Sequence, residues 1–217
     1  MSNLSTLLSA KGEHDEAESL LRRAINIDQS ALGPEHSNVA IRLNNLGQLL
    51  FKTGCTAEAE PLLRQGLKIN QSAFGPKHPS VAISLNNLAR LLQFTGRLTE
   101  AEQTFRQSLE IDEEIFGSNH PNVAIGCNNI GMLLRDMGRT SEAAEFMGRA
   151  ASSLIQASLK ADREHFHVQS VVDNYCQLLM AAGLSLSEIQ CRLAGFRKAA
   201  SDELMQADDS SNPNRPL

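Results

Sequence analysis

Apolar residues recur along almost the whole chain at spacings of three and four, with polar residues between them. This spacing places the apolar side chains on one stripe of a helix, and there is no strict alternation of the kind that indicates a strand. In the middle of the chain the pattern predicts two helices, from about Ser80 to Phe94 and from Thr99 to about Ile115. Gly96 suits a left-handed C-cap between them, and Thr99 with Glu102 fits a capping box.

The same pair of helices returns every 42 residues. Residues 33–74 and 75–116 are identical at 22 of 42 aligned positions, and a further copy begins at Gly117. A fixed period of this length indicates stacked repeats, because an isolated helical hairpin cannot bury its apolar stripe and its neighbours do so. We therefore expect an all-α solenoid of about five helix-turn-helix repeats, the first incomplete. The expected repeats are 1–32, 33–74, 75–116, 117–161 and 162–206, with a final helix from about Ser187 to Gln206 and a disordered tail, 207–217.

Small and large residues are placed so that the two helices of a hairpin can approach closely. A small residue on the first helix makes room, and a large residue on the second fills the space opposite. The chain resembles the tetratricopeptide family at these positions, and its 42-residue period with G-P-x-H-P and V-A-x-x-L-N-N-L resembles the kinesin light chain type. The resemblance runs from Asn3 to about residue 205 and implies a right-handed superhelix whose first helices line a concave groove. The positions that carry it are Leu88, Ala89, Leu92, Ala101, Phe105 and Ser108, and Leu46, Gly47, Leu50 and Ala59 one repeat earlier.

Pairs of asparagines occur in the middle of three first helices, where Asn is a mediocre helix former. A side-chain amide donates and accepts at once, so it can hold the backbone of an extended peptide whatever the peptide's sequence. The alternative is a ladder of amides that bonds one repeat to the next. For the first member of each pair, Asn44, Asn86 and Asn128, both interpretations stay open. For the second member, Asn45, Asn87 and Asn129, the peptide groove is favoured.

Further polar side chains are expected one turn along the same face, with an excess of positive charge. They are Gln48, Lys52, Arg90, Gln93 and Arg135, and they favour an acidic peptide as the partner. Ile41, Ile83 and Ile125 stand where the resemblance would place a lysine of the chaperone-tail clamp, which argues against a chaperone-tail receptor.

Composition excludes several other classes. The chain has 217 residues, 41% hydrophobic and 21% charged, with a net charge of −5 and no run rich in Lys and Arg, so nucleic acid is not the expected partner. It has no apolar run of membrane-spanning length and no signal peptide, and its four cysteines lack metal-site spacing. We expect reduced thiols and a cytoplasmic protein that does not act on membranes.

No enzyme motif is present, so we expect no catalytic residues, no cofactor and no metal. His36, His78 and His120 are each displaced by one repeat and cannot converge on one ion. We expect these loop residues to bond helix-end backbone groups instead.

The first repeat begins in the middle of a helix, and Leu4, Leu7 and Leu8 are expected to be partly exposed there. Self-association through this uncapped end is therefore possible. The favoured function is a non-enzymatic scaffold that binds a peptide or partner protein in the concave groove. The alternatives are a sensor or regulatory fragment of a larger signalling ATPase and a self-assembling structural repeat protein.

Overall fold

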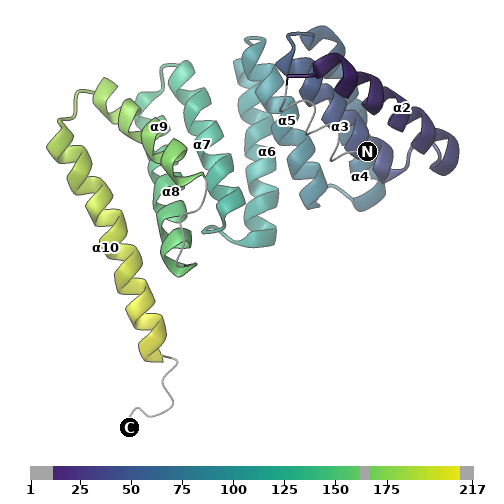
Figure 1. Ribbon diagram of the computed structural model, residues 1–217. Coiled ribbons are helices and arrows are strands. Elements are labelled where there is room, and N and C mark those ends of the chain that lie inside the picture. Colours follow the sequence, from purple (N-terminus) through teal and green to yellow (C-terminus); the bar gives the residue numbers. More distant parts are fainter. Residues whose placement is uncertain (1–11, 162–166, 211–217) are drawn as a thin grey trace. The chain divides into compact units, whose positions relative to one another are not determined.

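The computed structural model describes residues 12–161 and 167–210, and these residues form helices without strands (Figure 1). The all-α prediction therefore holds for this part of the chain. In chain order the helices are α2 (His14–Leu32), α3 (Ser37–Lys52), α4 (Thr56–Phe74), α5 (Pro79–Phe94), α6 (Leu98–Phe116), α7 (Pro121–Asp136), α8 (Thr140–Lys160), α9 (Val168–Ala181) and α10 (Leu186–Ser210).

The chain divides into two compact units, Met1–Ile111 and Asp112–Leu217, and the division falls within α6. In the first unit α2 packs on α3, α3 on α4 and α4 on α5, and α3 also touches α5. In the second unit α7 packs on α8, α8 on α9, and α10 on both α8 and α9. These helices therefore bury their apolar stripes mainly on helices near them in the sequence.

Histidines are the N-cap residues of α3, α5 and α7, the first helices of three hairpins. The Nδ1 atoms of His36, His78 and His120 accept the backbone N–H two residues later at 3.1, 3.1 and 3.2 Å, which confirms that these residues cap helix ends. The rings of His78 and His120 also stack on Phe74 and Phe116, with centroids 4.3 and 4.5 Å apart. At His78 and His120 the cap and the ring stack together tie the start of one hairpin to the end of the helix before it.

Gly96 ends the α5 turn with a φ of 79°, as expected of a left-handed C-cap. The expected capping box that follows it is wrong. Helix α6 begins at Leu98, so Thr99 lies inside its first turn. Arg97 takes the place before the helix and bonds Glu100 three residues later.

In two hairpins a glycine lets the two helices approach each other closely, as expected from the sequence. A Cβ added at Gly47 would lie 2.7 Å from Cγ of Leu63, and one added at Gly131 would lie 2.5 Å from Cγ of Met147. Leu63 and Met147 are fully buried. A glycine on the first helix therefore admits a large side chain from the second.

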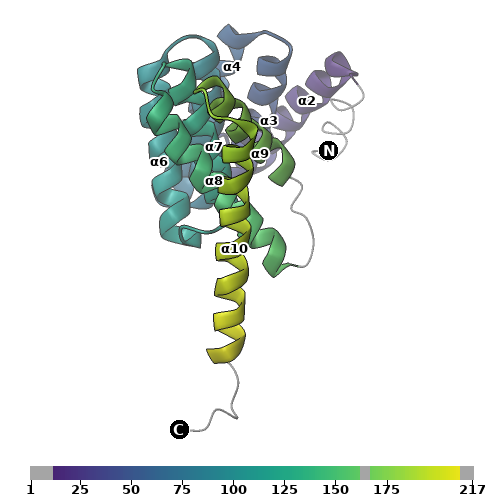
Figure 2. The same cartoon turned by 90° about the vertical axis from the view of Figure 1, so that its left-hand side faces the viewer.

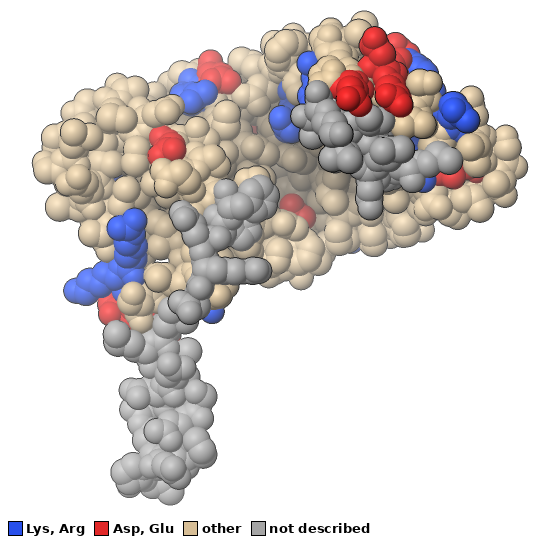
Figure 3. Space-filling model, viewed as in Figure 1, with Lys and Arg blue, Asp and Glu red and all other residues tan. Residues whose placement is uncertain are grey.

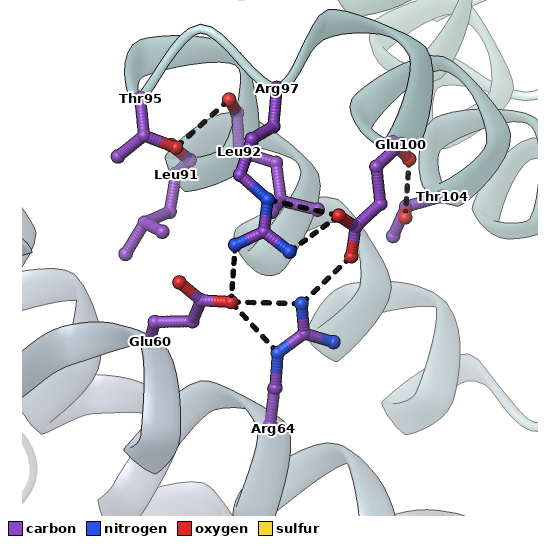
Figure 4. A network of polar contacts seen from close by, with 8 residues as sticks. All are labelled: Glu60, Arg64, Leu91, Leu92, Thr95, Arg97, Glu100 and Thr104. Carbon is purple, nitrogen blue, oxygen red and sulfur yellow. Dashed lines mark hydrogen bonds and ion pairs between the residues drawn. The ribbon is translucent and has the colours of Figure 1, made fainter. Parts of the chain in front are cut away.

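An ion-pair network joins two hairpins of the first unit (Figure 4). Arg64 donates to Glu60 at 2.9 Å and to Glu100 at 2.8 Å, and Arg97 donates to Glu60 at 2.7 Å. Hydrogen bonds from Arg64 and Arg97 lower the pKa of Glu100. Burial would raise the pKa of Glu60, but bonds from Arg97 and Arg64 outweigh it and lower that pKa too. This contribution to stability is present at neutral pH and is lost as the pH falls through the lowered pKa values.

The last helix, α10, projects past α8 and α9 in both views (Figures 1 and 2). It continues to Ser210, four residues beyond the expected end at Gln206, so the predicted tail does not begin at 207. The tail beyond 210, and the leucines expected to be exposed at residues 4, 7 and 8, lie outside the described residues.

Because Gly47 packs closely against Leu63, adding a side chain at position 47 should lower the stability of the protein. Gly47→Val should lower the free energy of unfolding by about 1–3 kcal/mol through overpacking, although valine is the better helix former. The matched control is Gly195→Val on α10, where an added Cβ meets nothing within 4 Å. Urea denaturation followed by circular dichroism measures both. Equal stability of the two variants would show that the close approach is not a packing constraint.

Candidate functional site

Two neighbouring first helices of the first unit present matching faces to solvent. Residues spaced four, three and four apart share one side of a helix, because each residue turns the chain by about 100°. Helices α3 and α5 touch each other, so their two rows lie side by side. We call this surface the α3–α5 face, and it consists of Ile41, Asn45, Gln48 and Lys52 on α3 and Ile83, Asn87, Arg90 and Phe94 on α5.

Three large apolar side chains of the α3–α5 face are exposed. Ile41 is 50% exposed, Ile83 is 59% exposed and Phe94 is 69% exposed. Phe51 meets Phe94 edge-on, with ring centroids 5.3 Å apart. Exposed apolar groups gathered at equivalent repeat positions indicate a contact surface rather than chance exposure. Phe94 was missed from sequence, although its place, equivalent to that of Lys52, already put it on this face.

The second asparagines of the first unit lie on this face, as the turn of the helix predicts. Asn45 is half-buried. Asn87 is only 7% exposed, and its Nδ2 atom is buried without a hydrogen-bond partner. A buried donor without an acceptor costs about 1–3 kcal/mol, so Asn87 holds an unused capacity to donate.

Two of the three positively charged residues expected on this face, Lys52 and Arg90, belong to it. Lys52 and Arg90 are exposed, and Gln48 is half-buried. Gln93 and Arg135 are six residues beyond Asn87 and Asn129, a turn of about 240°, so they point to another side of their helices. Arg135, in the second unit, also pairs with Asp136 at 3.3 Å. Their contribution to a peptide site stays a prediction.

The first asparagine of the pair on α3 bonds between repeats. Asn44 donates from Nδ2 to the Ala40 carbonyl at 3.1 Å and to Oγ of Ser84 on α5 at 2.9 Å. Asn70 on α4 donates to the same Oγ at 2.9 Å, and Ser84 in turn donates to the Ser80 carbonyl at 2.9 Å. All three polar side chains are buried. Ser84 therefore ties α3, α4 and α5 together, as the ladder interpretation of Asn44 predicts.

The second unit has its own ladder. Asn174 on α9 donates from Nδ2 to Oδ1 of Asn128 on α7 at 3.3 Å, and Asn128 contacts Sδ of Met132 at 3.5 Å. Asn128 is buried, whereas Asn129 is half-buried, as is Asn86 in the first unit. The first asparagine thus bonds to another repeat in both α3 and α7, and the second stands closer to solvent on α3 and α7.

Other chemistry is sparse in the described ranges. Within them no three His, Cys, Asp or Glu side chains lie together as a metal site, and no helix is long and apolar enough to cross a membrane. All four cysteines are free thiols. Burial raises the pKa of the Cys127 thiol to about 11, which keeps it protonated and unreactive. On the face shown in Figure 3, charged side chains form only small groups.

The family model described as "Tetratricopeptide repeat" matches residues 1–72, 43–114 and 80–156. A search of curated proteins found no match. Among solved structures, the chain is similar to a Podosopora anserina protein with nearly identical TPR-like repeats of kinesin light chain type, at 23% identity and TM-score 0.70, covering 93% of each chain. BtubC (BKLC) from P. vanneervenii is 21% identical, TM-score 0.72, over 100% of this chain and 82% of that one. MamA is 12% identical, TM-score 0.55, over 94% and 96%. These likenesses confirm the α-solenoid fold.

Neighbouring asparagines on α3 should respond in opposite ways to truncation. Asn44→Ala removes a buried hydrogen bond to Ser84 and should lower the free energy of unfolding by about 0.5–1.5 kcal/mol. Asn45→Ala, one position along, should leave it unchanged or raise it slightly, because alanine is the better helix former. Chemical denaturation of the two variants compares them directly. If Asn45→Ala proves the more destabilising, the assignment of the two amides is reversed.

Proposed function

Because the chain belongs to the tetratricopeptide repeat family, in its kinesin light chain type, we propose that it binds an extended peptide of a partner protein on the α3–α5 face. Tetratricopeptide proteins generally serve as protein-interaction scaffolds. The proposal adds the place of binding and the chemistry of the bound segment, in a groove formed by the first helices.

The unused Nδ2 donor of Asn87 is the observation that carries the proposal. This donor is buried. Rotation of the Asn87 side chain toward the face would bring it to a backbone carbonyl of a bound peptide, which would accept the hydrogen bond and remove the cost of the unpaired donor. Asn45 holds the equivalent position on α3, so two amides stand in register along the face. Two such contacts hold a backbone in place without depending on the side chains of the peptide.

The rest of the face supports an acidic peptide with apolar side chains. Lys52 and Arg90 are exposed and carry no acidic neighbour on the face, so a carboxylate of the peptide finds two cations there. Ile41 and Ile83 offer apolar surface next to the amides. The positive charges favour acidic over other peptides and speed up the encounter, whereas the burial of apolar area supplies much of the affinity.

We extend the proposal to the second unit only at Asn129, the equivalent of Asn87 on α7. Asn44 and Asn128 are left out, because they are buried in ladder bonds. The role is non-enzymatic, and free thiols at all four cysteines fit a reducing compartment, so we propose the cytoplasm as its place of action. Self-association through the first repeat and a sensor role within a larger protein stay predictions of the sequence.

A random decapeptide library displayed against the full chain tests the proposal. Selected peptides should be enriched in Asp and Glu beside aliphatic or aromatic residues, and their binding should weaken as salt rises. Asn87→Ala should weaken a selected peptide about 2- to 10-fold, the loss of one net hydrogen bond. Arg90→Glu should weaken it at least as much, because a charge on the face is reversed.

The matched control is Lys68→Glu, which makes a comparable charge reversal at an exposed site on α4, away from the face. Fluorescence anisotropy gives the affinities, and circular dichroism verifies that each variant is folded. Selection of peptides without acidic residues would refute the charge preference. Unchanged affinity in folded Asn87→Ala and Arg90→Glu would refute the α3–α5 face as the site.

A further inference from the structure

Two kinds of side chain recur on the α3–α5 face from one repeat to the next. Ile41 and Ile83 stand at equivalent positions of the 42-residue repeat and are 50% and 59% exposed. Asn45 and Asn87 follow one helical turn further along, again at equivalent positions. The face therefore presents the same apolar side chain and the same amide twice, once on each helix.

Helices α3 and α5 are joined directly at two levels of this face. Nδ2 of Asn44, next to Asn45, donates to Oγ of Ser84 at 2.9 Å. Toward the ends of the same two helices, the rings of Phe51 and Phe94 meet edge-on with centroids 5.3 Å apart. The axes of helices packed in this way are about 8–10 Å apart. A contact made on α3 is therefore repeated about 8–10 Å away on α5.

An extended peptide that crosses from α3 to α5 covers this distance in about three residues. Three residues rise about 10 Å in a β-strand and about 9 Å in polyproline II. In a strand the side chains alternate, so residues i and i+3 point to opposite sides. In polyproline II three residues complete one turn, so residues i and i+3 point to the same side. Of these two conformations, only polyproline II presents one side of its backbone to both helices.

The two amides favour the same conformation of the ligand. Polyproline II has no internal hydrogen bonds, so its backbone carbonyls are free to accept. The carbonyls of an α-helix are already bonded within the helix. Carbonyls three residues apart in the ligand can therefore accept from Asn45 and, once its side chain rotates toward the face, from Nδ2 of Asn87.

Charge complementarity selects the residues between the two apolar contacts. Lys52 and Arg90 are exposed on the face, so an acidic residue beside an apolar one brings a carboxylate toward a cation. A proline in the remaining position fixes its own φ at about −65° and keeps the residue before it out of the helical region. Both restrictions favour polyproline II before binding, which lowers the conformational entropy that the peptide loses when it binds.

We propose that the α3–α5 face binds a partner segment in the polyproline II conformation, with apolar side chains at positions i and i+3 packed on Ile41 and Ile83. The two positions between them hold an acidic residue and a proline. This inference rests on the proposed function and adds to it the conformation and the spacing of the bound segment. The partner is accordingly a protein with an acidic, proline-containing segment.

Synthetic peptides of one composition test the spacing against the full chain. Three peptides carry two leucines at i and i+2, i and i+3, or i and i+4 in the same background of Glu and Pro, so their net charge is equal. Fluorescence anisotropy should show the i, i+3 peptide binding about 5- to 10-fold more tightly than the other two, because each of those loses one of the two aliphatic contacts.

A second comparison tests the conformation. Replacing the proline between the leucines of the i, i+3 peptide by glycine keeps the spacing and the charge but frees the unbound backbone. The glycine peptide should bind about 2- to 5-fold more weakly, because it has more conformational freedom to lose. Equal affinity of the two peptides would overturn polyproline II as the bound conformation.

A variant of the protein ties the spacing to the two isoleucines. Ile83→Ser leaves one apolar contact, so affinity should fall and the preference for i, i+3 should disappear. Ile41→Ser makes the same prediction from the other helix and replaces it if Ile83→Ser does not fold. The matched control is Ile27→Ser on α2, a residue 49% exposed and off the face, which should keep both affinity and preference. Circular dichroism verifies that each variant is folded.

The outcomes separate this inference from the proposed function. If all three spacings bind equally, or if i, i+2 or i, i+4 binds best, while Arg90→Glu weakens them all, the inference is overturned and the peptide site stands. Retention of the i, i+3 preference in folded Ile83→Ser would likewise overturn it. If none of the peptides binds, or Arg90→Glu leaves their affinity unchanged, the site itself is refuted and the inference with it.

Discussion

Stacking depends on a shared constraint: a polar side chain that enters the apolar surface between hairpins has to find a hydrogen-bond partner on the neighbouring helices, although Oδ1 of Asn44 and of Asn70 stay buried without one. Ser84 shows how tightly this operates, because its hydroxyl accepts from Asn44 and Asn70 and donates to the Ser80 carbonyl. Three helices meet at that one oxygen. In a buried site an unpaired polar group costs about as much as several such bonds contribute net, so the pairs have to change together. Where they do, as at Asp28 with Arg42, the two hairpins are held together.

The same constraint separates structure from function within two adjacent residues. Asn44 and Asn45 differ by about 100° around α3, enough to direct the first toward the next hairpin and leave the second on the α3–α5 face. A residue committed to the ladder is unavailable for a ligand, and a residue on the face is unavailable for the ladder. We propose that this division is why asparagine occurs in pairs at a position where it is a poor helix former. On α5 the burial is reversed, since Asn87 is buried and Asn86 is half-buried. We propose that the second asparagine of the pair hydrogen-bonds a ligand, whereas the first hydrogen-bonds the neighbouring repeat.

Repetition made the fold predictable from sequence. Helix ends were expected within a few residues, and the histidine caps and the close approach at Gly47 followed from local rules. The partner of Asn44 could not be inferred, because Ser84 is 40 residues away and its equivalents are an arginine and a glycine. Sequence therefore identified which residue types matter, whereas their division between ladder and face required the three-dimensional contacts.

The central claim, that the second asparagine meets a ligand and the first does not, can be tested by following side-chain amides in ¹H–¹⁵N spectra during titration with a library-selected acidic peptide. The account predicts that the Nδ2 resonances of Asn45 and Asn87 shift with the peptide while that of Asn44 stays in place. The hydrogens of Asn87 Nδ2 should also become more slowly exchanging once they have an acceptor. Movement of the Asn44 resonance with Asn45 and Asn87 unchanged would contradict the account.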